Sequence, residues 1–394
     1  MVQLSRRRLL QGAGATLATW GFHQAIDRQQ AVLAQPSDRK FALLVGINKY
    51  SRAPLRGCVN DVILQYNLLV HRFGFDPDNV KVVLDEDATR DSILTAFEEH
   101  LIDQAKPGDV AFFHYSGHGA LVRDPDGVFT NRRDQGINGT FVPIDGRLAS
   151  RDARDREPVQ DIMGRTLFLL MSAIETEHFT AVLDSCHSGG ADRPELTVRS
   201  VDDVDASQIA QQELDYQNQW LARLDLSLDD FIRNRQRGIA KGVVLTSAQE
   251  AQLAVDDTSL NGFVAGAFTY RLTQHLWQQN TTPAAAIAEI NRIMPTHYRQ
   301  TPQLETKPET NHAHEPILFI EPPYAPADAI VKLIEANGQA TVIVVGVNPE
   351  TVNAGTVLTT PNRTAQVIVT ERQGLFSIGR VSGRLREGDL LRVQ

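Results

Sequence analysis

Residues 109–119 read Asp-Val-Ala-Phe-Phe-His-Tyr-Ser-Gly-His-Gly, an apolar run that passes directly into small and polar residues. Residues 179–190 have the same design, because Phe-Thr-Ala-Val-Leu-Asp is followed there by Ser-Cys-His-Ser-Gly-Gly. Continuous apolar runs of this length are typical of strands that are buried on both faces of a parallel sheet. The two stretches therefore predict strands whose carboxyl ends carry His118 and Cys186.

The surrounding sequence alternates such runs with segments of helical periodicity. This alternation predicts an α/β fold with a mostly parallel sheet and helices on both of its faces. In such sheets, function gathers at the carboxyl ends of the strands. The further predicted strands are residues 41–47, 81–84 and 242–246, and the predicted helices are residues 58–72, 89–104, 166–175, 265–279 and 283–294.

Residues 1–34 have the pattern of an export signal. Adjacent arginines in Ser5-Arg6-Arg7-Arg8 precede a weakly apolar run, and Val32-Leu33-Ala34 has the spacing of a signal-peptidase site. The pattern resembles a bacterial twin-arginine signal and predicts an exported, periplasmic or otherwise extracytoplasmic protein. The alternative is an amphipathic, partly disordered terminus. The apolar run is too short and too rich in Gly and Thr to predict a membrane span.

The rest of the chain divides into two predicted domains. Residues 35–321 form the α/β domain, with a polar insertion at about 193–240. Residues 322–394 begin with a proline-rich linker and continue with short β-rich runs that are separated by Gly, Asn and Pro. This part predicts a small all-β barrel or sandwich that serves binding, targeting or packing. Its runs are residues 340–347, 357–360, 365–370, 375–381 and 390–393.

The composition is that of an ordinary globular protein, with 42% hydrophobic and 22% charged residues in 394. Collagen-like, coiled-coil and disordered classes are excluded on this ground. Two cysteines are too few for a disulfide framework or a cysteine-rich zinc module. The net charge of −9 argues against nucleic acid as a partner and favours basic partners.

The strand ends hold the residue types that nucleophilic catalysis needs. A cysteine thiolate can attack a carbonyl, and a histidine can then protonate the leaving amine. The backbone N–H groups of Gly119 and Cys186 are the candidate donors to the oxyanion that develops. Each residue alone has a structural alternative, because a single buried cysteine is usually a small hydrophobe. His114 lies inside its strand and is interpreted as structural, and His187 is a poor base for the cysteine beside it.

The sequences at the two strand ends resemble two conserved motifs, or boxes, of a known peptidase family. Residues 115–119 (Tyr-Ser-Gly-His-Gly) and 184–189 (Asp-Ser-Cys-His-Ser-Gly) are similar to the histidine and cysteine boxes of metacaspases, which are called orthocaspases in prokaryotes. Residues 57–61 resemble the segment that opens the first helix of the family, and residues 300–303 resemble the segment before its last strand. The resemblance covers about residues 41–320 and implies a caspase-like fold. The Gln-Ala-Cys box of caspases proper is absent.

The resemblance implies a cysteine endopeptidase that cleaves proteins after Arg or Lys. It makes Cys186 the nucleophile and His118 the general acid/base. It also implies that the specificity pocket is lined by Asp61, Ser116 and Asp184, with Cys58 close by. Carboxylates suit a pocket for guanidinium or ammonium groups. The alternative for Asp61 is an acid in the first turn of a helix, which the helix dipole favours.

Two features depart from the family pattern. Many metacaspases require calcium, which is held by acidic residues that include an Asp-Asp pair. This chain has the single Asp161 at that place, so calcium binding is a possible but doubtful expectation. We expect no organic cofactor. Five aspartates could supply oxygen ligands, and we interpret them as a solvated acidic surface: Asp134, Asp152, Asp155, Asp161 and Asp192. The polar insertion is long, and the family often cuts itself in this region. The candidate autoprocessing residues are Arg233, Arg235, Arg237 and Lys241.

The sequence thus predicts an exported metacaspase-like cysteine endopeptidase whose partners are protein substrates with Arg or Lys before the cleaved bond. The alternative is a catalytically silent caspase-fold scaffold or chaperone. The intact pair of His118 and Cys186 argues against it. An α/β hydrolase or nucleotide-binding domain is excluded, because the chain has no Gly-x-Ser-x-Gly elbow and no phosphate loop.

Overall fold

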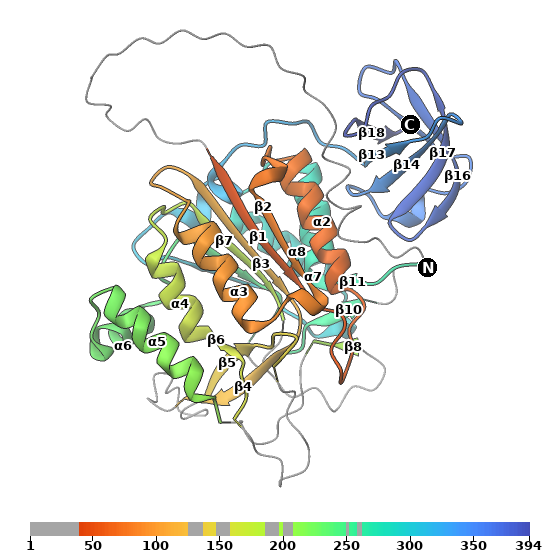
Figure 1. The fold of residues 1–394 in the computed structure, drawn as a ribbon. Helices are drawn as coiled ribbons and strands as arrows, with labels where there is room; N and C mark the ends of the chain where they lie inside the picture. The colour runs from red at the N-terminus through yellow and green to blue at the C-terminus, as the bar shows by residue number, and fades with distance from the viewer. Residues whose placement is uncertain are drawn as a thin grey trace, which may run out of the picture.

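The computed structural model describes residues 39–124, 137–146, 158–185, 197–199, 208–249, 252–257 and 262–394. Its centre is a six-stranded sheet in the order β12-β9-β7-β3-β1-β2 (Figure 1). All neighbouring strands are parallel except β12, which pairs antiparallel with β9. The strands are β1 (Lys40–Gly46), β2 (Val80–Leu84), β3 (Val110–Ser116), β7 (Phe179–Asp184), β9 (Val243–Thr246) and β12 (Gln303–Thr306).

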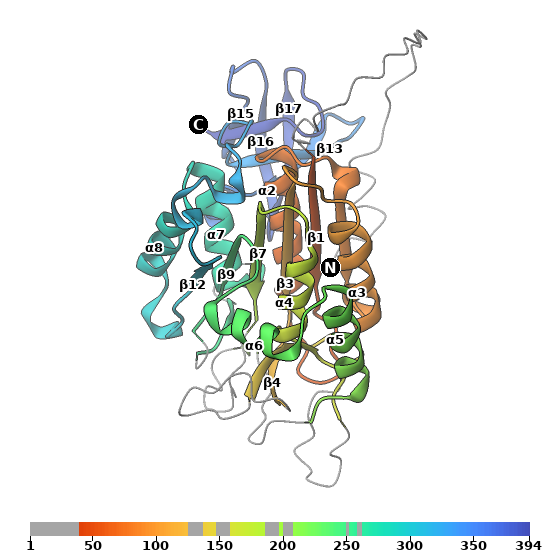
Figure 2. The ribbon, with the colours of Figure 1, turned by 90° about the vertical axis from the view of Figure 1, so that its left-hand side faces the viewer.

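Helices cover both faces of this sheet (Figure 2). Alternate strand residues point to opposite faces, and therefore Leu44 belongs to one hydrophobic core while Leu43 and Val45 belong to the other. The predicted α/β fold with helices on both faces is confirmed. One face carries α2 (Cys58–His71), α7 (Ala267–Gln278) and α8 (Pro283–Ile293), and the other carries α3 (Arg90–Phe97), which continues as a π-helical turn (Glu98–Ile102), and α4 (Gly164–Ala173).

Two small sheets lie beyond the carboxyl ends of the central strands. One contains β4 (Gly119–Arg123), β5 (Ile137–Phe141) and β6 (Ile162–Met163). The other contains β8 (Thr197–Val198), β10 (Val255–Asp257) and β11 (Ala265–Gly266), with β10 in the middle. Neither sheet was predicted from the sequence. β6, β8, β10 and β11 have only two or three residues and are too short to show a periodicity. β4 and β5 have five residues each, but neither contains an apolar run of four.

The polar insertion contains two helices, α5 (Gln211–Arg223) and α6 (Leu228–Arg237). Glu213 fastens α5 to the domain. One of its carboxylate oxygens lies 2.6 Å from Nη2 of Arg90, and the other accepts from the N–H of Met163 and from the hydroxyl of Thr166. Both charged side chains are buried. The insertion is therefore anchored to the core by a desolvated ion pair.

The C-terminal part is a closed six-stranded barrel, as the sequence analysis predicted for a small all-β domain. Ile330, Ile343 and Leu375 of this part belong to the same core as α2 and α7, and Figure 1 shows the barrel beside α2. The barrel strands are β13 (Ala329–Ile334), β14 (Gln339–Val344), β15 (Val357–Thr359), β16 (Gln366–Gln373), β17 (Phe376–Ser382) and β18 (Leu390–Val393). The first of them was not predicted.

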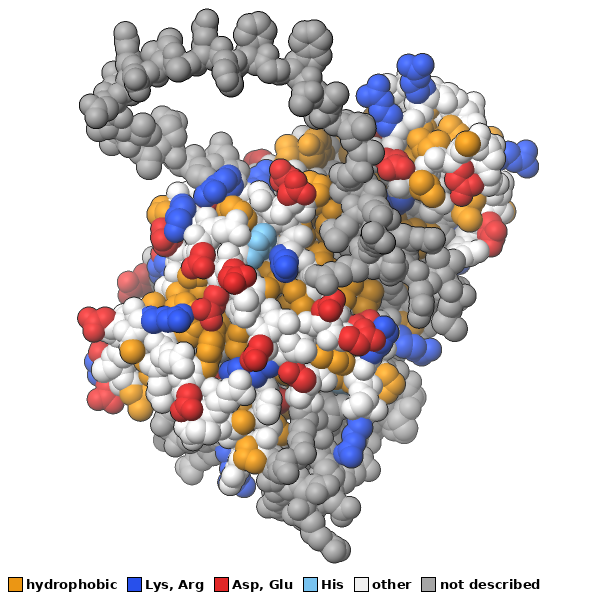
Figure 3. Space-filling model, in the orientation of Figure 1, with side chains coloured by type: hydrophobic (Ala, Val, Ile, Leu, Met, Phe, Trp, Pro, Cys, Tyr) orange, Lys and Arg blue, Asp and Glu red, His pale blue; other side chains and the backbone are white. Residues whose placement is uncertain are grey.

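Acidic and basic side chains are interspersed on the face shown in Figure 3. Within the described ranges, no helix has the length and apolarity that a membrane crossing requires. The N-terminal segment 1–34, with its predicted export signal, lies outside the described residues.

Substitution of Glu213 tests the anchor of the insertion. Glu213→Ala leaves the buried guanidinium of Arg90 without its main partner, and we expect the free energy of unfolding to fall by about 3–5 kcal/mol. Asp215→Ala, on the exposed side of the same helix, is the matched control and should change it by less than about 0.5 kcal/mol. Urea titration measures both values. Equal stability of the two variants would contradict the assignment.

Candidate active site

His118 follows the end of β3 and is fully buried. Its Nε2 lies 2.6 Å from the carbonyl oxygen of Ala53. A carbonyl can only accept, so Nε2 carries the proton and Nδ1 has a lone pair. The Nδ1 atom is buried and finds no hydrogen-bond partner within the described ranges. Burial lowers the pKa of His118, which favours the neutral imidazole and makes Nδ1 available as a base.

Two tyrosines hold this histidine in place. The N–H of His118 donates to the hydroxyl of Tyr50 (3.0 Å), and the hydroxyl of Tyr115 donates to the carbonyl of His118 (2.9 Å). The rings of Tyr50 and His118 lie 4.5 Å apart between centroids. Gly117 is required here, because a Cβ on it would lie 2.6 Å from the Tyr50 hydroxyl oxygen. The imidazole therefore has one preferred orientation.

Cys186 lies outside the described residues, as does His187. The strands that precede the two boxes are neighbours: β3 pairs in parallel with β7, and Ser116 is opposite Asp184. His114 is structural, as expected, because it is buried within β3 and its Nδ1 lies 3.0 Å from the carbonyl oxygen of Val182.

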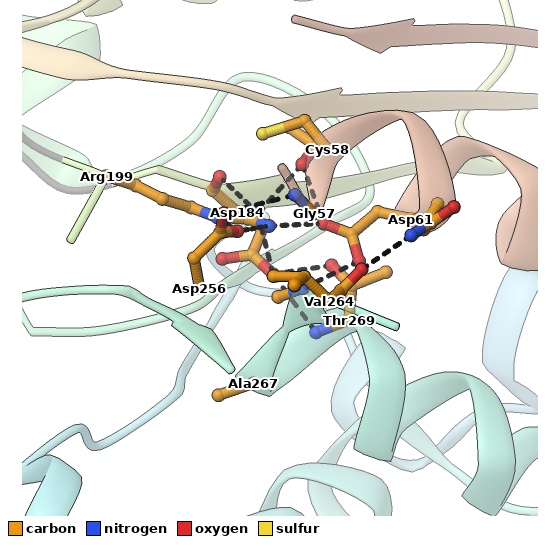
Figure 4. A network of polar contacts seen from close by, with 12 residues as sticks. Gly57, Cys58, Asp61, Asp184, Arg199, Asp256, Val264, Ala267 and Thr269 are labelled. Atoms are coloured by element: carbon orange, nitrogen blue, oxygen red, sulfur yellow. Dashed lines mark hydrogen bonds and ion pairs between the residues drawn. The ribbon is translucent and has the colours of Figure 1, made fainter. Parts of the chain in front are cut away.

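The predicted pocket residues Asp61, Ser116 and Asp184 surround one guanidinium group, that of Arg199. Figure 4 shows Asp61 and Asp184 beside this group. Asp61 in the first turn of α2 lies 2.7 Å from Nη2. Ser116 at the end of β3 lies 2.7 Å from Nη1 and donates its own proton to Asp61. Asp184 at the end of β7 lies 3.3 Å from Nη1. All four side chains are inaccessible to solvent.

Two members of this cluster were not anticipated from the sequence, Asp256 and Arg199 itself. Asp256 lies in β10 and accepts from Nε (3.1 Å) and Nη2 (2.7 Å) of Arg199 through Oδ1. Its Oδ2 accepts from the backbone N–H groups of Arg56 and Gly57. No motif surrounds Asp256, and Arg199 is one arginine in a polar stretch, so neither position carried a signal in the sequence.

Two glycines and the first turn of α7 pack closely against the carboxylates of this cluster. A Cβ on Gly266 would lie 2.2 Å from Oδ2 of Asp184, and a Cβ on Gly57 would lie 2.4 Å from Oδ1 of Asp256. The backbone N–H of Gly266 donates to Asp61, and both the N–H and the hydroxyl of Thr269 donate to Asp184. The carboxylates are thus held in fixed positions by the backbone.

The electrostatic balance of the cluster is unequal, with three carboxylates and one guanidinium. Burial raises the pKa of Asp61 to about 7, against the opposing attraction of Arg199 and with a further contribution from Asp184. Burial opposes the charge of Arg199, but Asp184 and the other acidic groups nearby raise its pKa, so it stays charged. Burial also raises the pKa of the Cys58 thiol, which is therefore a neutral neighbour of the pocket.

The structure also describes the predicted oxyanion donor Gly119 and the four candidate autoprocessing residues. The N–H of Gly119, the predicted oxyanion donor, donates to the carbonyl oxygen of Arg199 (3.1 Å). Arg233, Arg235 and Arg237 lie within helix α6, and Lys241 is 2.8 Å from Glu177.

Of the five aspartates interpreted as a solvated surface, four lie outside the described residues: Asp134, Asp152, Asp155 and Asp192. The interpretation was wrong for Asp161, which is buried and accepts from the hydroxyl of Thr140 (2.7 Å). The apolar residues that flank it, Val159, Ile162 and Met163, pack into the interior and carry it inward.

The raised pKa of Asp61 predicts a pH dependence of stability. Between its ordinary value of 3.8 and about 7, the folded protein binds a proton that the unfolded chain has lost. The contribution of Asp61 to the free energy of unfolding therefore decreases as the pH rises through this window, by up to about 1.4 kcal/mol per pH unit. Asp61→Asn should lack this contribution, so urea titrations of both proteins in a Cys186→Ala background from pH 4 to 8 should diverge. Parallel pH profiles would contradict the assignment.

Comparisons with known proteins agree with this architecture. The model of the family described as Caspase domain matches residues 39–312. Metacaspase-1 of Meyerozyma guilliermondii is 37% identical over 166 residues, which are 40% of this chain and 37% of that protein. Metacaspase-1 of Schizosaccharomyces pombe is 27% identical over 296 residues, which are 68% of this chain and 67% of that protein. The chain thus spans well under half the length of the Meyerozyma guilliermondii protein. The chain belongs to the caspase-domain family of cysteine peptidases and is metacaspase-like.

Proposed function

We propose that this peptidase is an endopeptidase that cleaves proteins after Arg or Lys, with Cys186 as the nucleophile and His118 as the general acid/base. The observation that carries the selectivity is the fully buried guanidinium of Arg199 among Asp61, Asp184 and Asp256. A site that already holds one guanidinium with complete desolvation can hold that of a substrate in the same way.

The physics of the pocket favours cations over other side chains. A neutral side chain would leave buried carboxylates without partners, which costs several kcal/mol. An acidic side chain would add another negative charge to those of the buried carboxylates. Arginine uses its five N–H donors in a planar fork, and lysine supplies the same charge with fewer donors. We therefore infer selection for Arg first and Lys second.

The proposed mechanism uses the tautomer of His118. Its Nδ1 lone pair takes the proton of the Cys186 thiol, and the thiolate adds to the carbonyl carbon of the substrate. The N–H groups of Gly119 and Cys186 stabilise the oxyanion. The C–N bond then breaks as His118 returns the proton to the leaving amine, and water hydrolyses the thioester. The hydrogen bond from Nε2 to Ala53 supports this role, because it keeps the lone pair on Nδ1.

Three further expectations belong to this proposal. The export signal at residues 1–34 would direct the protein out of the cytoplasm. Calcium is a possible activator, although Asp161 is already bonded to Thr140. Autoprocessing would occur in the connection that follows Cys186. The candidates Arg233, Arg235 and Arg237 are less suited to it, because a residue within a helix cannot bind as an extended peptide without local unfolding.

Reporter peptides test the proposed activity. Fluorogenic peptides that end in Arg, Lys or Asp are offered to the wild type, Cys186→Ala and His118→Ala under reducing conditions, with and without calcium. We expect turnover of the Arg and Lys peptides, no turnover of the Asp peptide, and losses of at least about 10³-fold in both variants.

Hydrolysis of the Asp peptide alone would refute the pocket assignment. Failure of every peptide, with a folded protein confirmed by circular dichroism, would favour the scaffold or chaperone instead. Arg292→Gln, which removes an exposed arginine on α8, is the control for changes in net charge.

A further inference from the structure

The backbone of Thr197–Arg199 lies as an added strand beside the site. Thr197 and Val198 pair antiparallel with Asp256 and Val255 of β10. The N–H of Arg199 donates to the carbonyl of Ala254 (3.0 Å). Addition of an extended peptide to an exposed strand edge is a common mode of peptide recognition, in which main-chain hydrogen bonds give affinity and pockets for side chains give specificity.

The side chain of Arg199 satisfies all of its donors inside the proposed specificity pocket. Nε donates to Asp256. Nη1 donates to the hydroxyl of Ser116 and to the carbonyl of Asp184 (3.2 Å), and Nη2 donates to Asp61 and Asp256. These five contacts match the five N–H groups of a guanidinium. A substrate arginine would need the same partners, and therefore the pocket cannot hold both.

The carbonyl group of Arg199 distinguishes a bound peptide from a structural ion pair. An arginine that only anchored the connection would need the carboxylates and nothing more. Here the carbonyl oxygen of Arg199 also accepts from the N–H of Gly119, the residue after His118. That N–H is the proposed oxyanion donor. The carbonyl carbon that carries the bond to Ser200 is thus held by the group that would stabilise its tetrahedral intermediate.

We propose that residues 197–199 are an internal substrate that fills the substrate site of the intact chain and presents the Arg199–Ser200 bond to Cys186. This inference rests on the proposed function. The sulfur of Cys186 would add to the carbonyl carbon of Arg199, and the bond to the nitrogen of Ser200 would break as His118 protonates that nitrogen. One water then hydrolyses the thioester, so the products are residues up to 199 with a free carboxylate and a chain that begins at Ser200.

The tether gives the internal segment an advantage over added peptides. A covalently linked ligand acts at an effective concentration of about millimolar for short flexible connections. An external peptide must displace it, and the intact chain should therefore bind arginyl peptides weakly until Arg199 leaves the pocket. The same segment identifies the form of the preferred substrate, an extended peptide that pairs with Val255 and Asp256 and ends in Arg.

Two measurements test this inference. The first maps fragments of the purified wild type by intact mass and N-terminal sequencing. We expect a fragment that begins at Ser200, and we expect it to be absent from Cys186→Ala and from Arg199→Gln. Arg292→Gln is the matched control and should be cut as the wild type is.

The second measurement needs no catalysis. Binding of fluorescein-labelled Thr-Val-Arg amide is compared in Cys186→Ala alone and with Arg199→Gln or Arg292→Gln added. We expect binding to be at least about tenfold tighter with Arg199→Gln and unchanged with Arg292→Gln.

The outcomes separate this inference from the proposed function. A wild type that hydrolyses arginyl reporters but stays intact after residue 199 overturns the inference and leaves the function standing. Unchanged peptide affinity on Arg199→Gln overturns it as well. If neither the wild type nor Arg199→Gln hydrolyses any Arg or Lys reporter, the proposed function falls. Should Arg199→Gln fail to fold, the fragment map of the wild type decides alone.

Discussion

The desolvated guanidinium of Arg199 is the interaction on which the site depends. Three carboxylates and one guanidinium, all removed from water, are stable only together, since loss of one partner leaves an uncompensated buried charge. Their residues come from the start of α2, the end of β7, β10 and the connection after the cysteine box. The cluster thus ties together four segments that are distant in sequence, and the proposed selectivity for cations rests on it.

The sheet brings these groups to one place. Because β3 and β7 are adjacent and parallel, their carboxyl ends lie side by side at one edge of the sheet. The buried strands make this arrangement rigid, and Tyr50 and Tyr115 extend that rigidity to His118. The backbone carbonyl of Ala53 keeps the proton on Nε2 of His118 and leaves the lone pair on Nδ1. The proposed oxyanion donor, the N–H of Gly119, is a backbone group as well.

Much of this could be predicted from residues whose local context is strong. The central strands are continuous apolar runs, whereas Asp61, Ser116 and Asp184 were assigned to the pocket through the resemblance of their motifs to those of metacaspases. Asp256 could not be found, because β10 has three residues and no motif. Asp161 was assigned to the surface from its charge, although it packs inward. The binding of Arg199 is a tertiary contact between segments far apart in the chain, and no local pattern encodes it.

The proposed function depends on recognition, by the pocket, of the positive charge of the residue before the cleaved bond. The most direct measurement compares kcat/KM for two peptides that differ only in arginine against citrulline, its uncharged isostere. We expect a preference for arginine of at least about 10²-fold, since citrulline would leave the buried carboxylates unpaired. A ratio near one would contradict it, because the carboxylates would then play no part in substrate recognition.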